Sequence, residues 1–249
     1  MADEPSFDRA RRGFLRMSGI AALAMLAVRS GPAPAQPSTG GAAMKIGIVG
    51  SGKLGGAVGA RWVKAGHEVL FSSRHPEELK GLVEGLGPRA RAGSVREAIA
   101  FGGVILIAVP YAALPQIGRE HAAELAGKIV IDACNPVAAR DGEIVQEAMA
   151  NGIGPTSQKY LPGARLVRAF NPVGFRNFEG EPRGGEKIGM PIAGDDPEAL
   201  KVAAQLARDA GVEPVVLPLA RAMDFAPGTP VFGKALPVSE LRNRLGVAQ

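Results

Sequence analysis

The feature that most constrains this chain is a glycine-rich loop near its first clear strand pattern. Residues 45–49 form a short apolar run, and the loop G-S-G-K-L-G follows directly. Beyond the loop, apolar residues recur every fourth position and predict a helix with one buried face: Leu54, Val58 and Trp62. A second apolar segment, 67–71, follows that helix. Strand, loop, helix and strand within about 30 residues predict a βαβ unit that binds a dinucleotide.

Each glycine of the loop has a physical reason to be there. The first glycine permits the tight turn, the second lets the backbone approach a pyrophosphate, and the third lets the helix pack closely on the strands. The first N–H groups of the helix and the positive end of its dipole attract phosphates. We therefore expect the cofactor phosphates at Gly50, Ser51, Gly52, Lys53, Leu54 and Gly55. The alternative interpretation is a structural turn without a ligand.

The end of the second strand indicates which nucleotide binds. A site for NAD has an acidic residue about 20 residues after the loop, where it binds the ribose 2′-hydroxyl. Here the strand ends in Ser72, Ser73 and Arg74, and the first acidic residue is Glu77. Hydroxyls and a guanidinium suit a 2′-phosphate, since arginine makes forked hydrogen bonds to phosphate oxygens. We predict NADP rather than NAD. The alternative for Arg74 is a solvated loop charge.

The rest of the chain alternates strand and helix patterns. Continuous apolar runs predict buried parallel strands at 102–110, 128–136 and 165–172. Helical segments are expected at 76–84, 95–101, about 112–125 and about 155–161. Further on, a strand at 188–194, a helix ending at Gly211, a strand at 212–218 and a helix near 238–245 are expected. This order predicts an α/β fold, a Rossmann-type doubly wound, mostly parallel sheet with a small C-terminal α/β extension.

Ligands in such sheets lie outside the carboxyl ends of the strands. We therefore expect Ala108, Val109 and Pro110 beside the cofactor. The candidates for the nicotinamide and acceptor pocket are Pro110, Cys134, Asn135, Asn171 and Val173. A small buried thiol is a better interpretation of Cys134 than a redox group. The two asparagines either hold a carboxamide or an acceptor carbonyl, or cap turns before proline.

The first 35 residues have the pattern of a twin-arginine export signal. Arg11 and Arg12 precede an uncharged apolar stretch at 17–28, and Ala33-Pro34-Ala35 has the pattern of a cleavage site. Twelve apolar residues span only about 18 Å as a helix, against a hydrocarbon core of ~30 Å, so stable membrane insertion is not expected. A periplasmic protein is predicted. The alternative is a cytoplasmic protein that starts at Met44.

These patterns divide the chain into four parts. They are the signal (1–35), a linker (36–43), an NADP-binding Rossmann domain (44–172) and a C-terminal α/β extension (173–249) that completes the acceptor site. Without the signal, the formal charge falls from +5 to +3, which gives no support for nucleic-acid binding. One cysteine and three histidines argue against a disulfide framework and a metal site. The sequence leaves open whether the protein forms a homodimer.

From Met44 to about Gly246, the chain resembles the NADP oxidoreductases that work with the deazaflavin coenzyme F420. The matching segments include I-V-G-S-G-K-L-G-G, L-F-S-S-R, V-I-D-A-C-N-P, R-A-F-N and A-G-D-D-P. The resemblance implies NADP on residues 50–54, with Ser51, Ser73 and Arg74 near its phosphates. It also implies a deazaflavin stacked on the nicotinamide near Pro110, Asn135, Asn171 and Val173. Segments 137–164 and 222–235 match less well, and both are candidates for the acceptor site.

The function predicted from these patterns is hydride transfer between NADPH and a deazaflavin or flavin-type acceptor by direct ring stacking. Such a transfer needs proximity and orientation more than acid–base groups, so no catalytic residue is assigned. A small-molecule redox acceptor is the expected partner. Two alternatives stay open: a non-catalytic NADP(H)-binding sensor, and a reductase of a small imine or hydroxy acid, which would normally add a large helical domain. A dehydrogenase acting on alcohols would usually need a proton-transfer residue.

Overall fold

Short runs of aliphatic side chains form the central strands in the computed structural model, which describes residues 42–180 and 185–248. The middle of the sheet consists of β1 (Lys45–Val49), β4 (Val104–Ile107) and β5 (Ile129–Asp132). These strands are buried on both faces, as parallel strands covered by helices require. The outer strands are β2 (Glu68–Ser72), β3 (Ala90–Gly93), β6 (Arg165–Arg168), β7 (Gly189–Gly194) and β8 (Glu213–Leu217).

The strand order is β3-β2-β1-β4-β5-β6-β7-β8. Every neighbouring pair is parallel except β6 and β7, which run antiparallel. The order reverses between β1 and β4, which is the switch point where ligands of such sheets bind. The predicted doubly wound, mostly parallel sheet is therefore confirmed. β7 and β8, from the C-terminal extension, continue the same sheet rather than form a second one.

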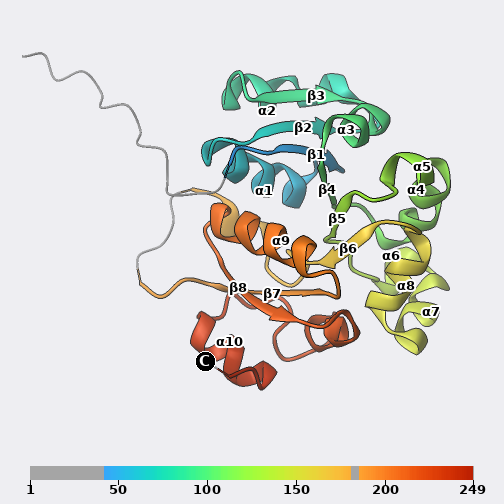
Figure 1. Ribbon diagram of the computed structural model, residues 1–249, viewed down its shortest axis with the longest axis vertical. Helices are drawn as coiled ribbons and strands as arrows, with labels where there is room; N and C mark the ends of the chain where they lie inside the picture. The colour runs from blue at the N-terminus through green and yellow to red at the C-terminus, as the bar shows by residue number, and fades with distance from the viewer. Residues whose placement is uncertain (1–41, 181–184, 249) are drawn as a thin grey trace, which may run out of the picture. The chain divides into compact units, whose positions relative to one another are not determined.

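Helices cover the two faces of this sheet (Figure 1). Alternation along β4 shows the division, because Val104 and Leu106 face one core and Ile105 and Ile107 face the other. The first core includes α1 (Lys53–Lys64), α2 (Lys80–Leu86) and α9 (Pro197–Asp209). The second includes α3 (Val95–Phe101), α4 (Leu114–Glu120), α5 (Ala122–Leu125), α7 (Ile144–Asn151) and α8 (Ile153–Tyr160).

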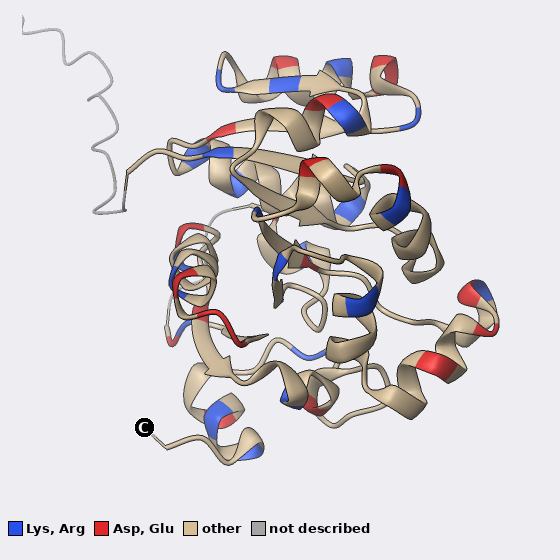
Figure 2. Ribbon diagram, turned by 45° about the vertical axis from the view of Figure 1, so that its right-hand side comes forward, with Lys and Arg blue, Asp and Glu red and all other residues tan. Residues whose placement is uncertain are grey.

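A third, smaller core covers the end of the sheet. Side chains of β7 and β8 pack there against η4 (Leu219–Phe225) and α10 (Val238–Leu245). Four short elements complete the described fold: the 3-10 helices η1 (Pro76–Leu79), η2 (Tyr111–Ala113) and η3 (Phe175–Phe178), and the single turn α6 (Ala138–Asp141). Figure 2 shows lysine and arginine interspersed with acidic residues along most helices of this view.

The expected elements at 45–49, 188–194 and 238–245 are confirmed nearly residue for residue. The strands expected at 102–110, 128–136 and 165–172 are shorter, since their last residues leave the sheet as loops. The helix expected at 112–125 is interrupted at His121. The sequence patterns do not predict β3, α7 or the short elements α6, η3 and η4.

The predicted export signal (1–35) and most of the linker (36–43) lie outside the described residues. Among the helices of the described ranges, none combines the length and the apolar character needed to cross a membrane.

Candidate nucleotide-binding site

The three glycines of the loop between β1 and α1 differ in their surroundings. Gly50 has a φ of +96°, and a Cβ atom there would lie 2.6 Å from the Ala108 carbonyl oxygen. A Cβ atom on Gly55 would lie 2.2 Å from the Gly50 carbonyl oxygen. On Gly52 it would meet no atom within 4 Å. The fold itself therefore requires Gly50 and Gly55, whereas Gly52 leaves open space in front of the helix.

The start of α1 offers unpaired donors to that space. Gly52 is the N-cap and has no side chain to satisfy the first N–H groups, and the first turn contains no acidic residue. The backbone N–H of Ser51 donates to the Ser72 carbonyl at 3.0 Å, which holds the loop against β2. The Ser51 hydroxyl is buried and has no hydrogen-bond partner. Open space, helix N–H groups and a free hydroxyl fit the phosphates of a dinucleotide.

The side chains at the end of β2 divide into one that is buried and two that are open. Ser72 is fully buried, and its hydroxyl donates to the Ile48 carbonyl at 2.7 Å, so this hydroxyl holds β2 to β1 and does not face a ligand. Ser73 is half-buried and accepts a hydrogen bond from the His75 backbone N–H at 3.1 Å. Arg74 is exposed and makes no ion pair within the described chain. Ser73 and Arg74 are the groups available to a 2′-phosphate.

The loops after β4, β5 and β6 lie next to this space. Ala108 and Val109 are half-buried, and Pro110 is exposed. The Asn135 side-chain amide donates to the Asn171 carbonyl at 2.8 Å, and the Asn171 amide donates to the Asn135 side-chain oxygen at 3.1 Å. These two hydrogen bonds join the ends of β5 and β6.

The segment around Asn171 has two unusual features. The side-chain oxygen of Asn171 is buried and accepts no hydrogen bond. The preceding residue, Phe170, has a φ of 63° and is the single non-glycine residue of the described ranges with positive φ. A left-handed bulky residue is strained, and such strain gathers at functional sites. The free oxygen of Asn171 can accept a hydrogen bond from an amide or ring N–H group of a ligand.

Besides the buried Asn171, two further residues of the predicted pocket lie inside the protein. The Cys134 thiol is buried, 3.5 Å from the Ile107 carbonyl oxygen, and burial raises its pKa well above the ordinary value. This position fits a small structural thiol. Val173 is also buried and packs in the core beneath α1. Neither side chain is open to a ligand in this structure, and the open residues of the predicted pocket are Pro110 and Asn135.

A buried ion pair, not anticipated from the sequence, lies beneath the pocket. Asp132 and Arg168 are opposite each other on β5 and β6, and both side chains are fully buried. The Cys134 N–H donates to Asp132 at 2.8 Å, and Arg168 donates to the Cys134 carbonyl at 2.7 Å. Arg168 also reaches the Ser157 hydroxyl at 3.2 Å, which lies 3.1 Å from the Tyr111 hydroxyl. This network fixes the loop that leads to Asn135.

Asp141, at the end of α6, holds two pocket loops together. Its carboxylate accepts hydrogen bonds from the N–H groups of Val137 at 2.8 Å and Ala112 at 3.3 Å. Arg140 pairs with the same carboxylate and donates to the Asn135 carbonyl at 2.8 Å. Burial by itself raises the pKa of Asp141, but these hydrogen bonds outweigh it and the pKa is lowered. The first of the two weakly matched segments, 137–164, therefore contacts the ends of β4 and β5.

The second weakly matched segment, 222–235, contacts the end of β6. The Gly233 N–H donates to the Pro172 carbonyl at 2.8 Å, and the Asn171 amide reaches the Phe225 carbonyl at 3.5 Å. Residues far apart in the sequence thus meet around one edge of the sheet.

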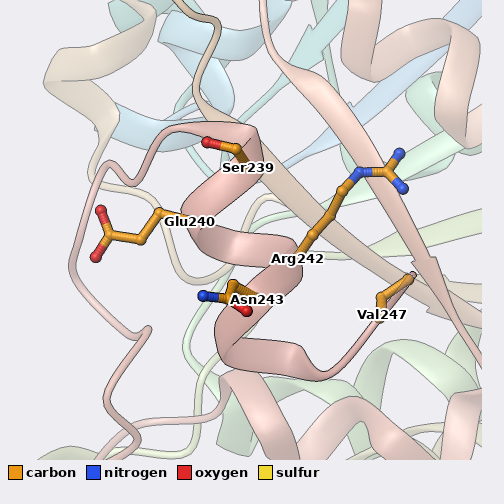
Figure 3. Close-up of a pocket in the computed structure, with 5 residues that line it drawn as sticks. All are labelled: Ser239, Glu240, Arg242, Asn243 and Val247. Atoms are coloured by element: carbon orange, nitrogen blue, oxygen red, sulfur yellow. The ribbon is translucent and has the colours of Figure 1, made fainter. Parts of the chain in front are cut away.

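Two surface hollows lie elsewhere in the fold. One, of about 430 Å³, is lined by Ser239, Glu240, Arg242, Asn243 and Val247 on and after α10. Figure 3 shows the Glu240 and Arg242 side chains pointing to different sides of that helix, and Glu240 is already paired with Arg244 at 2.6 Å. The other, of about 550 Å³, lies at the start of α9, where Arg165 and Asp196 form a two-bonded ion pair. Neither hollow gathers free chemical groups.

Within residues 42–180 and 185–248, no group of histidine, cysteine and carboxylate side chains is arranged to hold a metal ion.

Comparison with known proteins relates this site to NADP-dependent oxidoreductases. The family model for NADP oxidoreductase, coenzyme F420-dependent, matches residues 45–136, which carry the phosphate loop and the ends of β2, β4 and β5. Metalloreductase STEAP3 of Rattus norvegicus is 32% identical over 180 residues. That match covers 70% of this chain and 33% of the rat protein, so the chain spans about a third of the length of this relative.

Solved structures share the fold. A hypothetical protein of Sinorhizobium meliloti is 25% identical, with a TM-score of 0.68 over 78% of this chain and 95% of that one. A protein of Arthrobacter sp. FB24 named as an F420-dependent NADP reductase is 21% identical, with a TM-score of 0.63 over 78% of this chain and 99% of that one. The chain is thus similar to NADP-dependent oxidoreductases, and residues 45–136 match the model of one such family.

Proposed function

We propose that this protein transfers a hydride between NADPH and a deazaflavin or flavin-type acceptor whose ring stacks directly on the nicotinamide. The observation that carries the proposal is the open space at Gly52, bordered by the unpaired N–H groups of α1 and the free Ser51 hydroxyl. The matching NADP oxidoreductase domain of residues 45–136 contains these same groups.

Different residues would bind different parts of the cofactor. Residues 50–55 would hold the pyrophosphate, and Ser73 with Arg74 would hold the 2′-phosphate. When bound, NADPH supplies the hydride from its nicotinamide ring. Asn135 and Asn171 would orient the carboxamide, because the free oxygen of Asn171 requires a donor. The loops after β4 and β5 exclude water from that half of the site.

Proton transfer is not required of the protein for this reaction. The phenolic hydroxyl closest to the candidate loops belongs to Tyr111, which is buried and lies 3.1 Å from the Ser157 hydroxyl. Burial raises the pKa of Tyr111 far above the ordinary value, so it is a poor proton donor at neutral pH. A reductase of a small imine or hydroxy acid would need such a donor in the open pocket. Ring-to-ring hydride transfer needs orientation instead.

An acceptor screen tests this function. The purified full chain is mixed anaerobically with NADPH and, separately, with coenzyme F420, riboflavin, FMN or FAD, and NADPH absorbance is followed. We expect turnover with at least one of these ring acceptors and none with small imines or 2-keto acids. Turnover confined to the small carbonyl or imine compounds would overturn the proposal.

Export is a separate proposal, because the signal lies outside the described residues. We propose that residues 1–35 direct the folded protein, with its nucleotide bound, through the twin-arginine pathway to the periplasm. Replacing Arg11 and Arg12 together by lysine should leave the protein in the cytoplasmic fraction. An unchanged distribution between the fractions would favour translation from Met44.

A further inference from the structure

Two cations flank one aromatic ring beside the phosphate loop. Lys53, the first residue of α1, places its ammonium 5.4 Å from the centre of the Phe175 ring. Arg176 places its guanidinium 5.9 Å from the same centre. Phe175 begins η3, the short helix that follows the loop after β6 and packs along α1. The group therefore lies between the phosphate loop and the end of β6.

Neither cation has an acidic partner in the described chain. A similar arrangement at the opposite end of β1 provides a comparison, because Lys45 and Arg91 also flank one ring, that of Phe101. There the arrangement includes an acid, since Glu68 lies 3.6 Å from Arg91. The arrangement at Phe175 holds two like charges with no counter-ion, and the positive end of the α1 dipole adds to them.

The Phe175 group is held in place by the fold beneath it. Phe178, at the end of η3, is buried, and its ring centre lies 5.8 Å from that of Phe170. The Arg61 side chain of α1 donates to the Phe178 carbonyl at 2.8 Å. Since η3 is anchored at this end, Phe175 and Arg176 keep their place beside the start of α1. Arg176 itself is exposed and free to meet a ligand.

From this arrangement we infer that Lys53, Phe175 and Arg176 form a subsite for a phosphate or carboxylate on the side chain of the acceptor. The inference rests on the proposed function and extends it, because it requires an acceptor that carries negative charge away from its reacting ring. Lys53 would be shared with the cofactor phosphates, whereas Arg176 belongs to η3, on the segment that follows β6. Arg176 therefore determines acceptor specificity.

Binding of two flavins that differ by one phosphate group tests the inference without turnover. The full chain is saturated with NADP⁺, and quenching of flavin fluorescence gives the Kd values of FMN and riboflavin. We expect FMN to bind at least about tenfold more tightly, the size of one charge-assisted contact. The preference should shrink at high salt, since exposed charges are screened. Arg176→Glu should abolish it and leave the riboflavin Kd unchanged.

A charge-matched control is Arg119→Glu on α4, an exposed arginine of the other helix layer, which should keep the preference for FMN. Equal binding of FMN and riboflavin by the unaltered protein would overturn the inference and leave the proposed function standing. A loss of NADP⁺ binding in Arg176→Glu, with the FMN preference intact, would also overturn it and assign Arg176 to the cofactor. If neither the flavins nor coenzyme F420 bind, both the inference and the proposed function are wrong.

Discussion

Asp132 and Arg168 lie opposite each other on adjacent parallel strands and form an ion pair that is fully buried. Between them they hold both backbone groups of Cys134, and so the loop that carries Asn135. The carboxyl ends of β5 and β6 are therefore fixed by charge and hydrogen bonding rather than by apolar packing alone. A pocket that depends on orientation needs such a support.

Removing one partner of this pair should cost much of the stability of the protein. Asp132→Asn leaves the Arg168 charge buried without its counter-ion, and we expect a loss of about 3–5 kcal/mol in the free energy of unfolding. Urea denaturation followed by circular dichroism measures it. Glu84→Gln is the control, because it breaks the exposed Lys80–Glu84 pair with the same change in charge and should cost less than about 0.5 kcal/mol. Equal effects of the two variants would show that the buried pair contributes nothing particular.

The two glycines Gly52 and Gly55 should separate binding from folding. Gly52→Ala adds a methyl group to open space, so we expect the free energy of unfolding to change by less than about 1 kcal/mol. NADPH binding should weaken at least about tenfold, because that space is where the pyrophosphate would lie. Gly55→Ala places a methyl group against the Gly50 carbonyl and should lower stability by about 1–3 kcal/mol or more. If Gly52→Ala binds NADPH normally, the phosphates lie elsewhere.

Arg74 should distinguish the two nicotinamide cofactors. Replacing it by aspartate removes a charge-assisted contact to the 2′-phosphate, for which we expect a loss of about 1.5–3 kcal/mol in NADPH binding. NADH lacks this phosphate, and its Kd should change little. Isothermal titration with both nucleotides gives the comparison, and Arg119→Asp serves as the charge control. An equal loss for NADPH and NADH would show that Arg74 does not contact the 2′-phosphate.

Cys134 should behave as an inert thiol. Burial raises its pKa, so the reactive thiolate is scarce, and the side chain is shielded from reagents. We expect 5,5′-dithiobis(2-nitrobenzoate) to label it only as fast as the protein unfolds. Cys134→Ala should retain NADPH oxidation with the best acceptor. Fast labelling of the folded protein, together with loss of turnover in the variant, would assign the thiol a redox role.

The sequence was sufficient for the fold because its signals were local. The glycine loop, the apolar runs and the Asp196 cap of α9 each mark an element by neighbouring residues, and the Asp196 carboxylate does accept the Ala199 N–H at 3.0 Å. The sequence does not predict β3, because A-R-A-G at the sheet edge is largely exposed and lacks an apolar pattern. The antiparallel direction of β7 could not be predicted from the sequence. A strand buried on both faces has the same apolar pattern whichever way it runs.

The site was predicted less completely because it depends on register and side-chain partners. Asp132 and Arg168 were visible as charges inside apolar strands, but only the pairing of β5 with β6 brings them together. The sequence predicts Ser72 as a cofactor contact, but its hydroxyl donates to the Ile48 carbonyl inside the sheet. Arg140, Asp141 and Phe175 belong to segments without a recognisable motif. Their roles follow from contacts across the fold.

The most direct test of hydride transfer is a single-turnover experiment with NADPH deuterated on the hydride that is transferred. The full chain, NADPH and the best acceptor of the screen are mixed anaerobically in a stopped-flow instrument, and the NADPH and acceptor absorbances are recorded together. Direct transfer predicts that both signals change with one rate constant and that deuterium slows this rate. With a deazaflavin, the deuterium should stay on the ring carbon that receives it, whereas a flavin receives it on a nitrogen and exchanges it with water. Tight NADPH binding with no absorbance change for any acceptor would contradict direct transfer and identify the protein as a nucleotide-binding module without catalysis.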